Sequence, residues 1–452
     1  IIYLRLIREK YRIERVLIED TMDDITRKRF MQFESKMIHN LLDKFYIKGF
    51  TFGRASEDGK LSKFGSKRGL FRQNLLGKRV DFSGRSVITA GPFLRPDEVG
   101  IPMAMLHELF KPILIRELAK RLRIEDKRFN QYKALKLARK EHEEFTERIK
   151  KLIEEVCPKY DVFMNRAPSL HRYSVMGHRI RVTYGKCIYF PLMTVGPYNA
   201  DNDGDTLSVH LPITFEAMKE CRDLFHIRKH IMFSHENTPN IGYSNEMSVG
   251  SYLLTRYWEK PSDKFELVLN SRKEAEKLYN QGSVTPDTVV KFYNKDEEFG
   301  PVESYVTNIG SLIVEEIAKV RVNYVLGKKG CSKLISEINW KNGNGKQDLT
   351  LNQLSKLQTL FLEVATKSGI SIKYDDTLKS PETTERLEKS VSESMQYEGF
   401  ERTKFWDKIM NEESDKWFKE VPHEHPLYIM GQSGARVQEP QVKTMIVGKS
   451  LL

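Results

Sequence analysis

The sequence predicts an α+β protein that contains more than one domain. Its 452 residues exceed the roughly 100–200 residues of an ordinary domain. Long stretches carry apolar residues at helical spacing, whereas shorter stretches are β-branched and partly alternating. Strand character returns after a long helical stretch, so the helices are expected to form an insertion inside one β unit.

Helices are predicted where apolar residues recur three or four positions apart. Ile13, Val16 and Leu17 show this spacing near the N-terminus. Later, Glu/Lys pairs four positions apart support a helix that ends before Pro158. The helical ranges, with one or two helices in the first, are Arg12–Lys48, Pro102–Leu122, Asp126–Val156, Thr214–Phe225 and Ser244–Trp258.

Strands are predicted in short β-branched stretches bounded by turn residues. They are expected at Val80–Gly91, Tyr160–Met164, Ile180–Tyr184, Cys187–Leu192 and Leu207–Leu211. Loops rich in Gly with Ser, Asn or Lys are expected at Ser56–Gly69 and Trp340–Gln347. Beyond about Ser262 helices and short strands alternate, and the acidic stretch Ser380–Met395 and the run His425–Met430 are too short to assign by pattern.

The charge of the chain favours a polyanionic partner. Lys and Arg number 74 against 62 Asp and Glu, which gives a net charge of +12. Between Lys60 and Arg95 the only acidic residue is Asp81, whereas a solvated face usually mixes the two signs. The nine basic residues of this segment are Lys60, Lys63, Lys67, Arg68, Arg72, Lys78, Arg79, Arg85 and Arg95.

Other features limit the class of protein. No apolar run approaches the roughly 18–20 residues of a membrane span, so no membrane partner is expected. The first ten residues carry charges throughout and lack the apolar core of a signal peptide, which favours a cytoplasmic location. The cysteines are spaced too widely for a zinc site, so we expect reduced thiols and no zinc. They are Cys157, Cys187, Cys221 and Cys331.

The segment NADNDGD places three carboxylates, Asp201, Asp203 and Asp205, within five positions. Like charges this close raise one another's pKa unless a cation lies between them. One interpretation is a magnesium site of a phosphoryl- or nucleotidyl-transfer enzyme, because Mg²⁺ takes hard oxygen ligands. Alternate positions of an extended loop direct side chains the same way, and Gly204 permits a tight turn.

Two other interpretations of this segment remain open on local chemistry alone. The first is an ordinary turn in which Asp and Asn cap their own backbone. The second is a calcium loop of the EF-hand type. Against the calcium loop, position twelve is His210 instead of Glu, and strand-like sequence surrounds the segment where two helices are required.

Four ordered motifs resemble the largest subunit of multisubunit DNA-dependent RNA polymerases, the bacterial beta-prime type. They are LFRQNLLGKRVDFSGRSVITAGP (Leu70–Pro92), GIPMAMLHELFKP (Gly100–Pro112), MNRAPSLHR (Met164–Arg172) and YNADNDGDTLSVHLP (Tyr198–Pro212). Weaker similarity extends from about Arg12 to the end, through Arg27–Asp43, Lys273–Gly282, Thr366–Ile372 and Tyr428–Arg436.

The resemblance implies a double-psi β-barrel that carries the catalytic loop. The implied organisation is clamp-side helices and a loop at 1–66, a switch region and the first part of the barrel at 67–92, and a helical insertion at 93–159. The second part of the barrel, with the metal loop, is then expected at 160–212, and a pore or secondary-channel region at 213–452.

The resemblance also implies the site residues. Asp201, Asp203 and Asp205 match the ligands of a permanent Mg²⁺, and a second Mg²⁺ arrives with the nucleotide. Arg166 and Asn199 match the positions that contact the ribose of the incoming NTP. The positions that line the template path in the family are matched by Lys67, Arg72, Arg79 and Arg85.

The chain departs from the family pattern in two respects. Asn202 replaces the usual aromatic between the first two aspartates. The sequence also shows no cysteine zinc ribbon and no clear long coiled coil for sigma binding, and it stops before the bridge helix and trigger loop. We therefore expect a split subunit similar to those of giant-bacteriophage polymerases, in the infected host cytoplasm or the virion.

The expected activity is template-directed RNA synthesis within an assembly. Partners implied by the resemblance are a C-terminal beta-prime-like fragment, a beta-like subunit, a promoter-specificity subunit, the DNA template, the RNA transcript and NTPs. A metal-dependent nuclease would use the same carboxylates with water as nucleophile. A non-catalytic scaffold subunit is the third possibility, which the intact aspartate triad argues against.

Overall fold

A computed structural model describes most of the chain. The described residues are 2–18, 23–43, 50–51, 54–55, 75–77, 80–125, 130–234, 236–256, 265–294, 299, 304–343, 345–377, 380–436 and 439–446. They divide into two compact units, residues 1–81 and 82–452.

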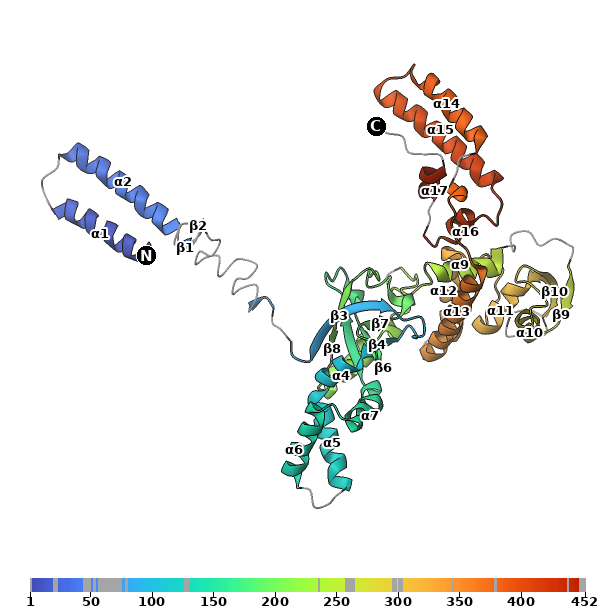
Figure 1. Ribbon diagram of the computed structural model, residues 1–452, viewed down its shortest axis with the longest axis horizontal. Helices are drawn as coiled ribbons and strands as arrows, with labels where there is room; N and C mark the ends of the chain where they lie inside the picture. Colours follow the sequence, from blue (N-terminus) through green and yellow to red (C-terminus); the bar gives the residue numbers. More distant parts are fainter. Residues whose placement is uncertain are drawn as a thin grey trace. The chain divides into compact units, whose positions relative to one another are not determined.

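The first unit contains a helical hairpin (Figure 1). Helices α1 (Ile2–Ile18) and α2 (Asp24–Asp43) pack against each other, and two short strands, β1 (Phe50–Thr51) and β2 (Arg54–Ala55), pair antiparallel. The helical prediction for this region is confirmed. The two helices are 17 and 20 residues long and lie side by side; that the chain lacks a clear long coiled coil for sigma binding stays a prediction.

The second unit is built around a closed six-stranded barrel with the strand order β3-β7-β4-β6-β5-β8. The pairs β3–β7 and β4–β6 are parallel, and β3–β8, β4–β7, β5–β6 and β5–β8 are antiparallel. This mixed, closed arrangement is consistent with the double-psi barrel that the sequence predicts. The strands are β3 (Ser83–Ala90), β4 (Glu98–Pro102), β5 (Asp161–Asn165), β6 (Val175–Thr183), β7 (Ile188–Phe190) and β8 (Thr206–His210).

Five of the six strands overlap predicted strands, although the prediction Ile180–Tyr184 covers only the end of β6, and β4 was missed. The middle of β4 carries no alternation because Val99, Gly100 and Ile101 are all buried. Its last residue, Pro102, directly precedes a helix. A five-residue strand that is buried on both faces and runs into a helix gives no period-2 signal.

In the described residues between β4 and β5, four α-helices form the predicted insertion (Figure 1). In α7 the apolar residues Ile149, Leu152, Ile153 and Val156 line one buried face. Asn130 caps α6 through its side-chain oxygen, which accepts a hydrogen bond from the Lys133 N–H at 2.8 Å. The helices are α4 (Met103–Leu109), α5 (Lys111–Glu125), α6 (Gln131–Glu143) and α7 (Glu147–Val156).

The segment after the barrel is mainly helical, with one small sheet. Strands β9 (Leu267–Leu269), β10 (Val289–Tyr293) and β11 (Ser304–Asn308) form that sheet in the order β11-β10-β9. The remaining helices are α8 (Phe215–Glu220), α9 (Glu246–Thr255), α10 (Arg272–Asn280), α11 (Ile309–Ala318), α12 (Lys328–Asn342), α13 (Gln347–Ser368), α14 (Pro381–Ser394), α15 (Gly399–Glu420), α16 (Pro426–Ser433) and α17 (Glu439–Ile446). The loop predicted at 340–347 is shorter than expected, because α12 continues to Asn342.

Helix α13 joins the helical segment to the barrel. The Gln358 side chain donates hydrogen bonds to the carbonyl oxygens of Pro92 and Leu94, which lie between β3 and β4, at 2.7 and 3.4 Å. Buried apolar residues of α13, such as Phe361, belong to the same hydrophobic cluster as the barrel. The barrel and α13 therefore share one core.

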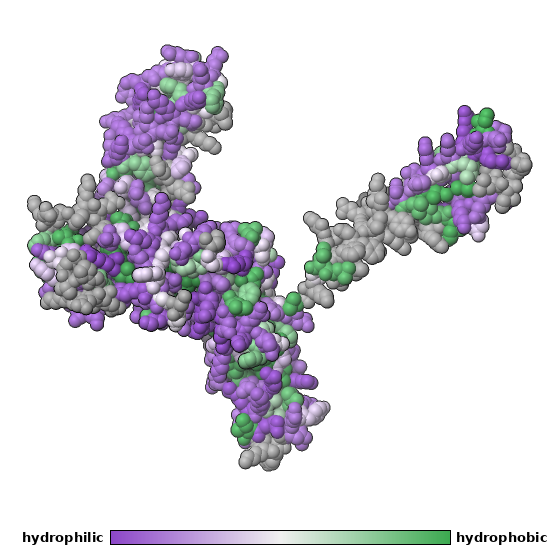
Figure 2. Space-filling model, turned by 180° about the vertical axis from the view of Figure 1, so that it is seen from behind, coloured by the Kyte–Doolittle hydropathy of each residue, from purple (hydrophilic) through white to green (hydrophobic). Residues whose placement is uncertain are grey.

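The surface of the displayed face is largely hydrophilic, with small scattered apolar areas (Figure 2). Among the described helices, none has both the length and the apolar character needed to cross a membrane.

We predict that the close crossing of α9 and α13 depends on Gly250. A Cβ atom at Gly250 would lie 1.9 Å from the backbone oxygen of Phe361, which cannot move without displacing α13. Gly250→Ala should therefore lower the free energy of unfolding by about 3 kcal/mol. Gly242→Ala is the matched control, because a Cβ there meets nothing within 4 Å. Equal unfolding midpoints in urea for the two variants would contradict this packing.

Candidate active site

The NADNDGD segment forms a loop at the barrel that is held at both ends. Before the loop, the buried Tyr198 side chain lies in the core. After it, the Asp205 carbonyl accepts a hydrogen bond from the Ile88 N–H of β3 at 2.9 Å, and β8 begins at the next residue. Gly204 adopts a φ of +118°, which L side chains rarely adopt. The loop is thus a short connection between two fixed points.

The three carboxylates of the loop have different surroundings. Asp205 is partly buried, and its Oδ2 accepts hydrogen bonds from the Arg166 Nε and the Asp201 N–H, both at 2.9 Å. Asp201 is exposed, and its Oδ1 accepts the Asn202 N–H at 2.9 Å. Asp203 is exposed, and no described residue forms a hydrogen bond or an ion pair with it. The backbone-capping interpretation therefore holds for Asp201 and Asp205.

The donor set of the loop suits Mg²⁺, although the side chains do not converge. In the described part of the chain, no group of three or more His, Cys, Asp or Glu side chains is arranged to hold a metal ion. Each of the three carboxylates nevertheless keeps at least one oxygen that accepts no hydrogen bond from a described residue. Carboxylate oxygens are the ligands that Mg²⁺ prefers. The chemistry of the residues fits the ion, and the assignment of the triad as metal ligands stays a prediction.

Arg166 reaches the loop because β5 and β8 are neighbours. Asn165, the last residue of β5, pairs with Ser208 in that antiparallel register, which brings the following residue, Arg166, to the end of β8 where the loop enters. The hydrogen bond from Arg166 holds the pKa of the Asp205 carboxyl below its usual value. Asp205 is therefore an anion at neutral pH even without a metal.

The other predicted site residues are placed as follows. Asn199 is exposed with a φ of +46°, and its N–H donates to the Gly196 carbonyl at 2.8 Å. Arg85 is exposed on β3, and its Nε donates to Thr206 Oγ1 at 2.7 Å. The three remaining template-path residues, Lys67, Arg72 and Arg79, lie outside the described residues.

Two features of the site were missed by sequence reasoning. Arg436, which follows α16, has its Nη2 3.9 Å from Asp201 Oδ2, although more than 200 residues separate them. A buried hydrogen bond at 3.0 Å joins His178 Nε2 to the Tyr198 hydroxyl. His178 is a lone histidine in a β-branched strand, so the sequence contains no pattern that predicts its contact with Tyr198.

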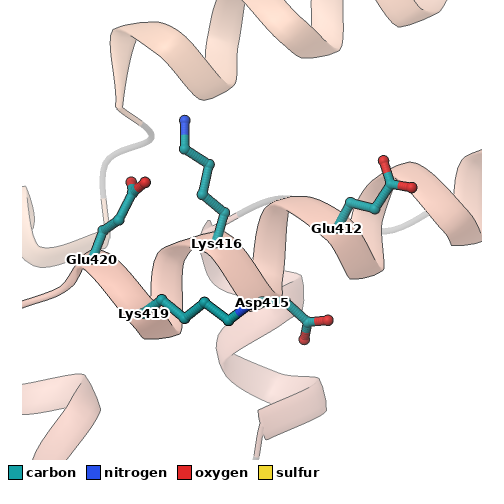
Figure 3. A pocket seen from close by; sticks show the side chains of 5 residues that line it. All are labelled: Glu412, Asp415, Lys416, Lys419 and Glu420. Atoms are coloured by element: carbon teal, nitrogen blue, oxygen red, sulfur yellow. The ribbon is translucent and has the colours of Figure 1, made fainter.

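The pockets of the second unit differ in their relation to the loop. One, of about 240 Å³, lies between α9, α13 and α16 and includes Arg436 in its lining. Another, of about 320 Å³, lies along α15 and is lined by residues of both charges (Figure 3). There the Lys416 Nζ is 3.0 Å from Glu382 of α14, so its charge is already paired. Of these two pockets, the first has a wall residue, Arg436, that contacts the loop.

The calcium-loop interpretation is wrong. An EF-hand loop needs a helix on each side. Here the loop follows the 3₁₀ turn Leu192–Thr194 and leads into strand β8. Position twelve of such a loop would be His210, whose Nδ1 is hydrogen-bonded to Ser83 Oγ at 2.9 Å.

Comparison with known proteins identifies similar chains. Residues 77–227 match the family model described as RNA polymerase Rpb1, domain 2. The whole chain aligns with the "DNA-directed RNA polymerase subunit beta'" of Sulfurihydrogenibium sp. (31% identity, 29% of that protein) and of Paracidovorax citrulli (30%, 34%). The subunit from Pseudoalteromonas translucida is 32% identical over 87% of this chain and 28% of its own length. The chain thus spans about a third of these relatives.

We predict that neutralising Asp205 and Asp203 has opposite effects on stability in metal-free buffer. Asp205→Asn loses the ion pair with Arg166 and should lower the free energy of unfolding by about 1 kcal/mol at pH 7. Asp203→Asn removes a like charge that has no partner among the described residues, so stability should stay equal or rise slightly.

The contribution of Asp205 to the free energy of unfolding should depend on pH. Its folded-state pKa is lowered, so its contribution is complete above the unfolded pKa of about 4 and disappears as the pH falls through the folded pKa. Urea unfolding with EDTA at pH 7 and near pH 2.5 measures both effects. If Asp205→Asn and Asp203→Asn lose the same free energy of unfolding at pH 7, the two carboxylates do not differ in this way.

Proposed function

Because residues 77–227 match RNA polymerase Rpb1 domain 2 and the whole chain aligns with beta' subunits of DNA-directed RNA polymerases, we propose that this chain carries the catalytic loop of such an enzyme. In this proposal it catalyses template-directed nucleotidyl transfer from NTPs to the RNA 3′-hydroxyl. It is active only inside a multisubunit complex.

The observation that carries the proposal is the loop that presents Asp201, Asp203 and Asp205 from a closed barrel. The loop lies inside the matched segment 77–227, and its ends are fixed by Tyr198 in the core and by the Asp205 carbonyl on β3. A fixed loop with three carboxylates suits a reaction whose catalysis is mainly positioning and charge stabilisation.

The three aspartates are the residues that would hold Mg²⁺. When bound, Mg²⁺ lowers the pKa of the attacking hydroxyl and neutralises the charge of the triphosphate. Asp203 and Asp201 are exposed and can rotate their carboxylates toward Asp205, which is held by Arg166. Arg166 thereby keeps one ligand ionised and oriented before the others arrive.

Arg166 and Asn199 are proposed to contact the NTP ribose. Only the Nε of Arg166 bonds Asp205, and its terminal nitrogens make no hydrogen bond with the described residues. The exposed Asn199 amide lies two positions before Asp201. Both groups bond hydroxyl oxygens well, and a contact to the 2′-hydroxyl disfavours dNTPs because the site is left with an unpaired polar group.

The template path is proposed to follow the basic segment before and within β3. Arg85 is exposed on β3, where its Nε is held by Thr206 next to the loop. With Lys67, Arg72 and Arg79 it would contact backbone phosphates, which a polymerase must bind without reading the bases.

The proposal includes assembly from separate polypeptides, as in giant bacteriophages. The partners would be a beta-like subunit, a C-terminal beta-prime-like fragment with the bridge helix and trigger loop, and a promoter-specificity subunit. Purification of the native complex, followed by mass analysis of the bound chains, is expected to identify the beta-like subunit and the fragment. Recovery of this chain without either would refute this part of the proposal.

We predict that the native complex extends an RNA primer on a DNA template when NTPs and Mg²⁺ are present. Asp203→Asn should lower the extension rate at least about a thousandfold, because the carboxylate acts on the reacting groups. Its unfolding midpoint should stay equal or rise slightly in EDTA. Asp415→Asn on α15 is the control and should extend normally.

The same assay separates the alternatives. Shortening of the primer without extension would indicate a nuclease. Normal extension by a complex that contains Asp203→Asn would indicate a scaffold subunit whose loop takes no part in catalysis.

A further inference from the structure

We propose that Tyr198 and His178 are positioning residues that hold the aspartate loop in place from inside the barrel. The contact involves no predicted site residue and belongs to no assigned site. Its catalytic consequence rests on the proposed function, whereas its effect on the loop does not.

Tyr198 is the last core residue before the loop. Its side chain is 1% exposed, and its ring packs edge-on against Phe190 of β7 with the centroids 5.1 Å apart. Two residues later in the chain, Ala200 is only half-buried, and Asp201 is 60% exposed. The position of Tyr198 therefore sets where the first carboxylate can lie.

The Tyr198 hydroxyl is tied to two different strands. It lies 3.0 Å from His178 Nε2 on β6 and 3.5 Å from the carbonyl oxygen of Met164 on β5. Two positions after Met164, Arg166 holds the Asp205 carboxylate. Both ends of the loop are thus fixed to β5, one through the Tyr198 hydroxyl and the other through Arg166.

A histidine at position 178 destabilises the fold unless its buried imidazole is hydrogen-bonded. It is fully buried, and its Nδ1 has no hydrogen-bond partner among the described residues. Burial lowers its pKa to about 3, so the ring is neutral at working pH. A buried neutral imidazole without partners is destabilising, and the Tyr198 hydroxyl is the group that Nε2 contacts. The pair therefore specifies one position for Tyr198 within an apolar core.

A matched control is available at Tyr243. Its side chain is 3% exposed, its hydroxyl donates to the Leu354 carbonyl at 2.8 Å, and its ring packs edge-on against Phe361 at 5.0 Å. It belongs to the same hydrophobic cluster as Tyr198 but lies about 40 residues after the loop. Tyr243→Phe removes a comparable buried hydrogen bond without touching the loop.

The first experiment measures hydrogen exchange of the loop in the full-length chain without metal. Tyr198→Phe should speed exchange of the Asp201 amide, which donates to Asp205 Oδ2, by roughly fivefold, the size of one neutral hydrogen bond. Tyr243→Phe should leave that amide unchanged. Equal exchange at Asp201 in wild type and Tyr198→Phe would overturn the proposal.

A second pair of variants keeps the test decisive if Tyr198→Phe does not fold. His178→Phe should loosen the loop as Tyr198→Phe does, whereas His178→Gln, which retains a hydrogen-bonding end, should restore slow exchange. If His178→Phe leaves the exchange of Asp201 as slow as in wild type, the proposal is wrong.

Manganese binding separates this inference from the proposed function. Mn²⁺ titrated into the full-length chain, followed by electron paramagnetic resonance, should bind about three- to tenfold more weakly to Tyr198→Phe than to wild type and Tyr243→Phe. If Asp203→Asn binds as well as wild type, the proposed metal site fails. If Asp203→Asn abolishes binding and Tyr198→Phe does not weaken it, only the positioning role fails.

Discussion

The attachment of Asp205 to the barrel is the constraint on which the site depends. Its carbonyl accepts from Ile88 on β3, while its carboxylate accepts from Arg166 at the end of β5 and from the Asp201 amide. Asp205 thus connects the loop to β3 and to the end of β5, two strands that are far apart in the sequence. Because Ile88 lies in β3, where it pairs with Ile188 of β7, and Arg166 directly follows the paired strand β5, the loop inherits the rigidity of the barrel.

Like-charge repulsion explains why such fixing is necessary. Three carboxylates on one short loop disfavour any conformation that brings them together. Arg166 offsets one charge directly, and Arg436 lies 3.9 Å from a second. Asp203 has no cation beside it among the described residues, so the three carboxylates differ: Asp203 is without such a partner, Asp201 is weakly paired with Arg436, and Asp205 is held by Arg166.

The fold around the loop was largely predictable, because five strands and the inserted helices show clear periodicity. Strand β4 was not predictable, since Val99, Gly100 and Ile101 are all buried and therefore show no alternation. Of the site, Asp201, Asp203, Asp205 and Arg166 come from motifs that the sequence displays. Arg436 and His178 could not be assigned in this way, because their contacts join residues far apart in the chain and have no spacing to detect.

The sequence by itself determined the chemical identity of the loop: three carboxylates, Asp201, Asp203 and Asp205, occupy alternate positions, with Gly204 between the last two. Tertiary structure alone decided that the three carboxylates have different surroundings. Strand register brings Arg166 to Asp205, burial sets Tyr198 against a neutral His178, and Asp203 is left in solvent. The reason is physical: the type of side chain is a local property of the sequence. Desolvation and ion pairing depend on neighbours that only folding supplies.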